Sequence, residues 1–233
     1  MSFYSMSFSS MSFLPSDTIL TFSQPLTPLS RDEHAFQIVE KGFKKKWLHT
    51  SKYAQIHAIY GITEGDLARS YRGKRFARSM NGGVYRHLFH GTRRACRIGD
   101  PGTGLLTPCH RESCSLCGIL RKSFTITGAR PGSMFGPGIY TTEVSSKADI
   151  YVRNHHVRSN MHAMLLCRVA YNRPQLVSVA DHSRICPDAG YDCVEAVRLV
   201  DGGSVDYPET VVYRDDAIVP VALIMYTRQG WEP

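Results

Sequence analysis

The sequence lacks any apolar run long enough to cross a membrane. A helix that spans a bilayer needs about 20 consecutive apolar residues, and no window of this 233-residue chain approaches that length. The first residues also lack the basic stretch and the apolar run of a secretory signal. We therefore expect a protein without membrane association that is intracellular, in the cytoplasm, the nucleus or both.

Acidic residues are scarce relative to basic ones. The chain has 20 Asp and Glu against 28 Lys and Arg, so its net charge is +8. This excess favours polyanionic partners such as a dinucleotide, RNA, DNA or an acidic protein. Many basic proteins have no such partner, so the charge alone does not choose among these classes.

Charged residues are also missing from the start of the chain. No charged side chain precedes Asp17, the triplet Met-Ser-Phe recurs at positions 1, 6 and 11, and Ser, Thr and Pro are frequent. We interpret residues 1–30 as a disordered tail rich in Ser and Phe. With 42% apolar residues, the chain has enough apolar side chains for a core, so we expect residues 31–233 to form one domain.

The first predicted helix begins near Ser30. Ser30 and Glu33 have the spacing of a capping box, and apolar residues recur at helical spacing over residues 36–47. Residues 53–60 fit a strand or a helix, and residues 64–78 have a basic, helix-like composition.

Beyond residue 84 the sequence favours β structure. Runs typical of strands occupy residues 84–89, 164–170, 175–180, 191–200, 209–213 and 217–226. Pro208 and Pro220 predict strand edges or bulges, and a short helix is predicted over residues 145–153. Because helices come first and strands later, we expect an α+β fold.

Three segments combine glycine with polar or aromatic residues in apolar surroundings. They are Phe89–Thr92, residues 134–151 and residues 207–213. Each is weak evidence by itself, because a His before a Gly is usually a turn residue and a Tyr after Gly-Ile usually lies in the core. Their order along the chain is more informative.

Taken in order, the segments resemble the poly(ADP-ribose) polymerase catalytic domain, which belongs to the diphtheria-toxin-like ADP-ribosyltransferases with a His-Tyr-Glu motif. That family carries a His-Gly-Ser/Thr strand end, an FGxGIY segment, a short helix with Ser-Lys, a second Tyr eleven positions after the first, and a Glu that opens a strand. The matching residues are His90-Gly91-Thr92, Phe135 to Tyr140, Ser146-Lys147, Tyr151, and Glu209 to Tyr213.

The resemblance implies the ADP-ribosyltransferase fold, in which two packed, mostly antiparallel sheets and flanking helices surround a cleft for NAD⁺. It implies that Tyr140 and Tyr151 stack on the nicotinamide ring, which is a flat aromatic cation. Gly91 would bind the nicotinamide carboxamide through its backbone. His90 would hydrogen-bond the adenosine ribose, with the Thr92 hydroxyl nearby.

Glu209 has two interpretations. As an isolated residue it is a solvated acid at the start of a strand. The resemblance instead makes it catalytic together with His90 and Tyr140, because a fixed carboxylate stabilises the oxocarbenium character that develops at C1′ of the nicotinamide ribose. The same carboxylate could act as a general base toward an acceptor.

One position departs from the family pattern. The family usually has Ser or Thr eight residues after the motif Tyr, where a hydroxyl holds the nicotinamide carboxamide, and this chain has Ala148. One lost hydrogen bond is worth about 0.5–1.5 kcal/mol, so NAD⁺ binding is weaker unless Ser145 or Ser146 compensates.

A second departure is a Cys-rich insertion at about residues 93–117. Its cysteines have the spacing C-x12-C-x4-C-x2-C and are Cys96, Cys109, Cys114 and Cys117, with His110 as an alternative ligand. Four thiolates suit tetrahedral Zn²⁺, and no open coordination position is indicated, so we expect a structural zinc site. The alternative is four reduced cysteines without metal.

We therefore expect an NAD⁺-dependent ADP-ribosyltransferase that releases nicotinamide and modifies a protein or nucleic-acid acceptor. Too few residues precede His90 for the helical regulatory domain and DNA-binding fingers of the polymerising members, so we expect mono-ADP-ribosylation by a monomer. The alternatives are NAD⁺ hydrolysis, with water as the acceptor, and a non-catalytic domain that binds NAD⁺ or ADP-ribose. Ala148 favours the non-catalytic alternative and Glu209 opposes it.

Overall fold

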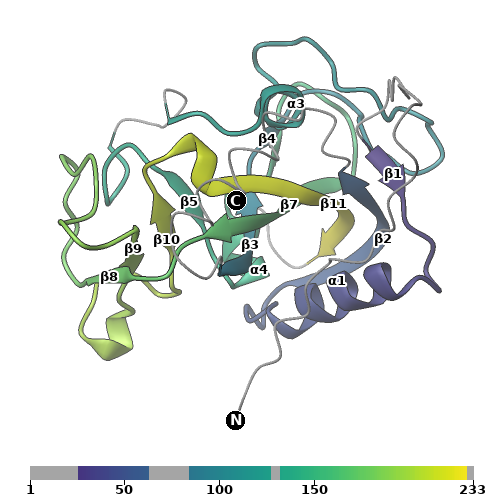
Figure 1. The fold of residues 1–233 in the computed structure, drawn as a ribbon. Helices are drawn as coiled ribbons and strands as arrows, with labels where there is room; N and C mark the ends of the chain where they lie inside the picture. The colour runs from purple at the N-terminus through teal and green to yellow at the C-terminus, as the bar shows by residue number, and fades with distance from the viewer. Residues whose placement is uncertain (1–25, 63–83, 127–131, 230–233) are drawn as a thin grey trace, which may run out of the picture.

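The framework of the molecule is a pair of β-sheets (Figure 1). The computed structural model describes residues 26–62, 84–126 and 132–229. The larger sheet has the order β1-β2-β11-β7-β3, with bounds Leu26–Pro28, Tyr53–Ile62, Ile218–Gln229, His162–Ala170 and Tyr85–Gly91. The smaller sheet has the order β5-β10-β9-β8, with bounds Ile139–Thr141, Thr210–Val212, Cys193–Ala196 and Pro174–Val177. The pairing is antiparallel throughout except for β8 with β9 and the separate short pair β4 (Arg93–Arg94) with β6 (Arg153–Asn154). The predicted α+β fold with two mostly antiparallel sheets is confirmed.

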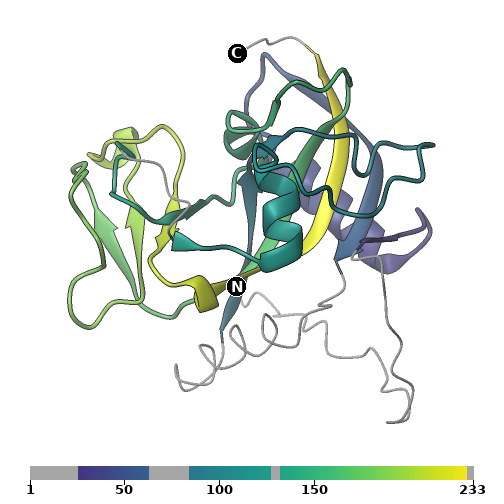
Figure 2. The same ribbon diagram turned by 90° about the horizontal axis from the view of Figure 1, so that it is seen from above.

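A helix packs on each face of the larger sheet. Helix α1 (His34–Lys45) buries its apolar side in one core, and α3 (Ser115–Lys122) buries its own in the other. Successive strand residues point to opposite faces, so Phe89 joins the core under α1 and Leu88 joins the core under α3. In Figure 1, α3 lies above the long strands and α1 below them; in Figure 2, seen from above, α3 lies in front of the strands and α1 behind them.

The two sheets meet beside the motif residues. The Phe89 N–H donates to the Thr142 carbonyl at 2.7 Å, and the Thr142 N–H donates back to the Phe89 carbonyl at 3.0 Å. This bridge joins the end of β3 to the end of β5. It therefore brings His90 beside Tyr140, although fifty residues separate them in sequence.

The predicted start of the first helix was four residues too early. Helix α1 begins at His34 because residues 30–33 form a turn, in which the Glu33 N–H donates to the Ser30 carbonyl at 3.0 Å. Half of the expected capping box is present, since the Ser30 N–H donates to the Glu33 carboxylate at 2.7 Å. The Ser30 hydroxyl bonds to Asp32 instead of capping the helix.

The N-terminal tail predicted over residues 1–30 extends too far along the chain, because a strand begins at Leu26. Leu26–Pro28 forms β1 at the edge of the larger sheet, where Leu26 pairs with Ile62 and is buried. An edge strand tolerates Pro28, because its nitrogen need not donate to a neighbouring strand. Residues 26–30 are thus part of the described fold, whereas the rest of the predicted tail, residues 1–25, and the basic segment 64–78 lie outside the described residues.

Several other boundaries needed correction. Residues 53–60 belong to a strand, β2. The helix predicted over 145–153 is the shorter α4 (Ser145–Asp149), and the last two residues of the strand predicted over 191–200 belong to a 3₁₀ turn, Leu199–Asp201. Pro220 causes a bulge, as predicted, but within β11 at the centre of the larger sheet. Over the ranges that the structure covers, every helix is too short or too polar to cross a bilayer.

A buried carboxylate fixes α4 to the larger sheet. Asp149 has no exposed surface, and its oxygens accept hydrogen bonds from the Tyr226 hydroxyl at 2.5 Å and from Arg228 Nη1 at 2.7 Å. Lys52 Nζ lies 3.7 Å from the same carboxylate and is also buried. These partners come from β11 and from the residue before β2, so the carboxylate joins three segments.

Candidate active site

The end of β3 lies directly against α4. A Cβ added to Gly91 would be 1.9 Å from the Ala148 carbonyl oxygen and 3.1 Å from the Tyr151 Cβ. Only a residue without a side chain allows this approach, so packing requires glycine at position 91. The Gly91 backbone is therefore held beside Tyr151.

His90 is held by two neighbours. Its Nδ1 lies 2.8 Å from the Tyr140 carbonyl oxygen, which can only accept, so Nδ1 carries the proton. The His90 and Phe124 rings are nearly perpendicular, with an interplanar angle of 87° and ring centres 5.0 Å apart. Burial lowers the pKa of His90, which favours the neutral ring and leaves Nε2 as a hydrogen-bond acceptor. Thr92 follows at the end of β3, half-buried, and its carbonyl accepts from the Arg153 N–H at 3.4 Å.

The Tyr140 hydroxyl is tied to the glycine loop that precedes it. It donates to the Gly136 carbonyl at 2.8 Å and accepts from the Phe135 N–H at 2.9 Å. Burial, together with the nearby Glu209 carboxylate, raises the pKa of Tyr140 to about 12. Gly136 has a φ of +72°, and a Cβ there would be 1.8 Å from the Arg184 carbonyl oxygen. The loop around Arg184 therefore packs directly on this turn.

Glu209 is buried, which excludes the interpretation as a solvated acid. It directly precedes β10, and only 4% of its surface is exposed. Its Oε1 accepts a hydrogen bond from the Tyr151 hydroxyl at 3.2 Å and lies 3.2 Å from Lys147 Nζ. Two of the three motif segments, residues 134–151 and 207–213, thus meet at this carboxylate.

Lys147 is the member of this group to which sequence reasoning gave no role. Burial acts to lower the pKa of Lys147, but the charge of Glu209 outweighs it and raises that pKa above the usual value. Lys147 Nζ also lies 5.7 Å from the centre of the Tyr151 ring. The Ser-Lys pair of the motif was the available signal, because α4 projects Lys147 toward Glu209.

Neither of the serines near Ala148 is free to replace the missing hydroxyl. The Ser145 hydroxyl donates to the Phe43 carbonyl at 2.7 Å. The Ser146 hydroxyl accepts from the Leu48 N–H at 2.9 Å and lies 2.6 Å from His49 Nδ1. The two hydroxyls attach α4 to the end of α1 and to the loop that follows it, so neither is available to compensate for Ala148.

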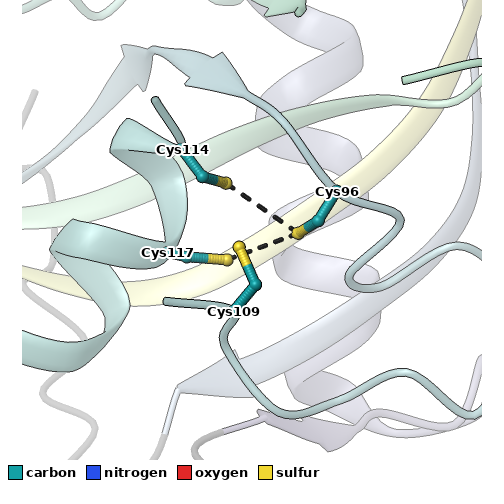
Figure 3. A group of neighbouring side chains, drawn as sticks. All are labelled: Cys96, Cys109, Cys114 and Cys117. Atoms are coloured by element: carbon teal, nitrogen blue, oxygen red, sulfur yellow. Dashed lines mark hydrogen bonds between the residues drawn. The ribbon is translucent and has the colours of Figure 1, made fainter. Parts of the chain in front are cut away.

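The four cysteines of the insertion form one cluster (Figure 3). Their Sγ atoms all lie within 4.8 Å of one another, and Cys96 Sγ is 3.8 Å from Cys114 Sγ and 3.5 Å from Cys117 Sγ. Tetrahedral coordination with bonds of about 2.3 Å places sulfurs about 3.8 Å apart. The four thiols could therefore hold a metal ion. The alternative ligand His110 is exposed and is not part of the group.

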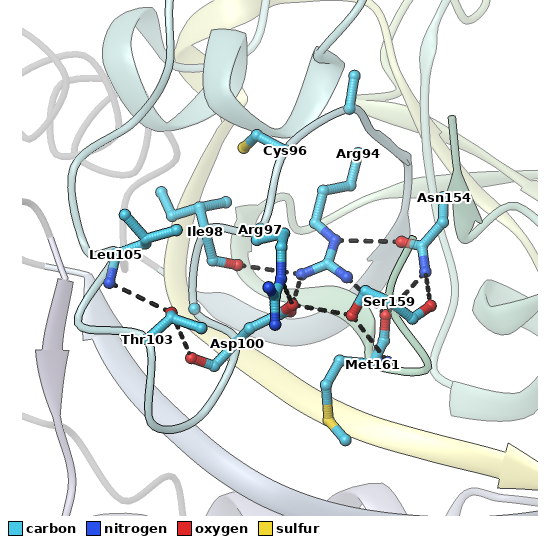
Figure 4. Close-up of polar contacts among 12 residues, drawn as sticks. Arg94, Cys96, Arg97, Ile98, Asp100, Thr103, Leu105, Asn154, Ser159 and Met161 are labelled. Atoms are coloured by element: carbon cyan, nitrogen blue, oxygen red, sulfur yellow. Dashed lines mark hydrogen bonds and ion pairs between the residues drawn. The ribbon is translucent and has the colours of Figure 1, made fainter. Parts of the chain in front are cut away.

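A buried arginine anchors the first part of the insertion (Figure 4). Arg94 forms an ion pair with Asp100, and its guanidinium also donates to Asn154 Oδ1 at 3.1 Å and to the Met161 carbonyl at 2.6 Å. Burial alone would raise the pKa of Asp100, but hydrogen bonds from Arg94 and Ser159 hold that pKa below its usual value. The loop after β4, which contains Asp100, is thus fixed to β6.

The fold and the site define the class of protein. Two mostly antiparallel sheets, with a strand-end His-Gly beside two tyrosines and a glutamate, form the arrangement of the ADP-ribosyltransferases. The sequence model of the family described as the poly(ADP-ribose) polymerase catalytic domain matches residues 33–229. The chain therefore belongs to this family. None of the curated proteins matches it.

The contact at Gly91 predicts the effect of adding one methyl group. In Gly91→Ala the new Cβ would overlap the Ala148 carbonyl oxygen, so α4 must shift, and overpacking of this kind costs about 1–3 kcal/mol. We expect a lower midpoint of thermal unfolding.

Gly42→Ala is the matched control. A Cβ at Gly42, inside α1, meets nothing within 4 Å, so this change should stabilise the protein by about 0.5–1 kcal/mol. If both variants unfold at the wild-type temperature or above, the close approach of β3 to α4 is wrong.

Proposed function

We propose that the protein is an NAD⁺-dependent mono-ADP-ribosyltransferase, which transfers one ADP-ribose unit to a protein or nucleic-acid acceptor and releases nicotinamide. The observation that carries this proposal is the buried Glu209 carboxylate with its partners Tyr151 and Lys147. A buried carboxylate is costly to maintain, and Lys147 compensates its charge. A domain that only bound NAD⁺ would not need an anion at this position.

The neighbours of Glu209 support the binding of nicotinamide. Tyr151 lies beside Gly91, and the Glu209 carboxylate helps to raise the pKa of both Tyr140 and Tyr151. Two aromatic rings and a glycine backbone beside one carboxylate suit a flat, cationic amide. The ring would stack on the tyrosines, and its carboxamide would pair with the Gly91 backbone.

The reaction exchanges one bond at C1′ of the nicotinamide ribose. The bond from C1′ to the ring nitrogen breaks, and its electron pair leaves with nicotinamide. Positive charge develops on the ribose, where the Glu209 carboxylate stabilises it. The acceptor then bonds to C1′ and loses a proton, for which Glu209 is the base. His90 would hold the adenosine ribose through Nε2.

Glu209→Gln tests this mechanism. The amide keeps the shape and a hydrogen bond to Tyr151 but removes the charge, so nicotinamide release should fall by about 10²–10³. The affinity for NAD⁺ should change much less, because the aromatic contacts remain. The measurement is the rate at which adenine-labelled NAD⁺ is consumed by the protein in the presence of a cell extract, because each NAD⁺ consumed releases one nicotinamide.

Glu195→Gln is the matched control, because Glu195 lies opposite Thr210 on the neighbouring strand and bonds to Tyr171. It should release nicotinamide at the wild-type rate. Label in protein or nucleic acid identifies the acceptor. Label only in free ADP-ribose would mean that the protein hydrolyses NAD⁺ and does not transfer ADP-ribose. A wild type that releases no nicotinamide would favour the non-catalytic alternative.

Ala148→Ser tests the orientation of the nicotinamide. A hydroxyl at this position would restore one hydrogen bond to the carboxamide, worth about 1 kcal/mol, and Ser145 and Ser146 are engaged elsewhere. We expect nicotinamide to bind several-fold more tightly, measured by calorimetry. Equal affinity in both proteins would mean that Ala148 does not face the carboxamide.

We also propose that the cysteine cluster holds one structural Zn²⁺. Four sulfurs at tetrahedral spacing favour this ion, and the Ala95 N–H donates to Cys114 Sγ at 3.2 Å, as expected around a thiolate ligand. Purified protein prepared without added zinc should contain about one equivalent by elemental analysis.

Cys109→Ser should lose most of this zinc and unfold at a lower temperature, because a ligand of the loop is removed. Cys186 is exposed and lies outside the cluster, so Cys186→Ser should retain the full equivalent. Correctly folded wild-type protein without any metal would contradict the proposal.

A further inference from the structure

Two segments that lead away from the candidate site converge on the cysteine cluster. The first continues from Gly91 at the end of β3, through β4, to Cys96. The second is α3, which contains Cys117 and leads to Phe124. The cluster therefore joins the strand that carries His90 to the helix that precedes Phe124.

The path from α3 to Phe124 is tightly constrained. Ser123 ends the helix with a φ of +63° and a ψ of −170°, a conformation that residues with a side chain rarely adopt. Its N–H donates to the Ile119 carbonyl at 2.8 Å. Beyond Phe124, the Ile126 N–H donates to Asp215 Oδ1 at 2.7 Å. Surrounding contacts must hold the chain in this path, because the local backbone does not favour it.

Phe124 transmits this constraint to His90. Its side chain is buried, with 4% of the residue exposed, and its ring meets the His90 ring edge to face at 5.0 Å. The Tyr140 carbonyl fixes Nδ1 of the same ring. Together, these two contacts set the direction of Nε2, the nitrogen that would accept from the adenosine ribose.

We propose that Phe124 is a positioning residue for the adenosine half of NAD⁺, and that the metal-bound cysteine cluster sets the position of Phe124 through α3. Metal binding and adenosine binding are then coupled, and each strengthens the other by the same factor. This inference rests on the proposed function, because it uses the role of His90 in NAD⁺ binding.

The coupling is selective for one half of the dinucleotide. His90 would contact the adenosine ribose, whereas Gly91 and the two tyrosines would hold nicotinamide. Loss of the Phe124 ring should therefore weaken the binding of ADP-ribose but leave the binding of nicotinamide unchanged. General damage to the fold would weaken the binding of both ligands.

The first test compares Phe124→Leu with the wild type, using calorimetry with ADP-ribose and, separately, with nicotinamide. Leucine keeps an apolar side chain but removes the ring edge that faces His90. We expect ADP-ribose to bind roughly three- to tenfold more weakly, which is the scale of one aromatic pair. Phe36→Leu is the matched control, because Phe36 is similarly buried but lies on α1, in the core on the other face of the larger sheet, and it should leave both affinities unchanged.

The second test adds Cys109→Ser, which removes a ligand of the cluster without touching α3. It should reproduce the selective loss of ADP-ribose affinity. In the double variant Cys109→Ser/Phe124→Leu the loss should be no larger than in Phe124→Leu alone, because both changes act on the same contact.

Three outcomes would overturn the inference. They are an unchanged affinity of Phe124→Leu for ADP-ribose, an equal loss of nicotinamide affinity, and additive losses in the double variant. A wild type that binds neither ligand would instead contradict the proposed function, and the inference would fail with it. A wild type that binds both and responds to neither change would contradict the inference alone.

Discussion

A carboxylate in an apolar interior is stable only when cations or hydrogen-bond donors surround it, and this constraint acts on Asp149. Its partners Tyr226 and Arg228 lie on β11, and Lys52 precedes β2. Removing any of them would leave the buried Asp149 carboxylate with one stabilising partner fewer. The result is a rigid junction between α4 and the larger sheet, from which the rest of the candidate site extends.

Helix α4 has a buried charge on each side of it. Asp149 faces the sheet, and two residues earlier Lys147 reaches the Glu209 carboxylate at 3.2 Å. The same short helix presents the Ala148 carbonyl to Gly91 and leads into Tyr151. Electrostatic anchoring on one side thus determines the geometry of the proposed chemistry on the other. A short helix is sufficient because its position is set by ionic and close packing contacts and not by its own helical stability.

The order of the motifs predicted which segments meet, and the structure brings His90, Tyr140, Tyr151 and Glu209 into one region. The sequence could not predict the partners of Asp149, because Lys52 and Arg228 lie in segments without a recognisable pattern. The functions of Ser145 and Ser146 were also not predictable, since a hydroxyl near a motif can bond to any nearby backbone group. The cysteine spacing predicted a cluster but not α3, whose eight residues are too few for a clear helical period. Boundaries such as β1 depended on pairing with a distant strand, which local sequence does not contain.

The contact between Gly136 and the Arg184 carbonyl has a consequence for comparisons among relatives. Two segments almost fifty residues apart share a space that excludes even a methyl group, so they cannot diverge independently. A homologue with any side chain at the position of Gly136 must route its later loop differently, through an insertion, a deletion or a changed turn near Arg184. Conversely, a homologue that keeps this loop length should keep the glycine. Variation in the length of residues 181–188 and the identity of residue 136 should therefore change together across the family.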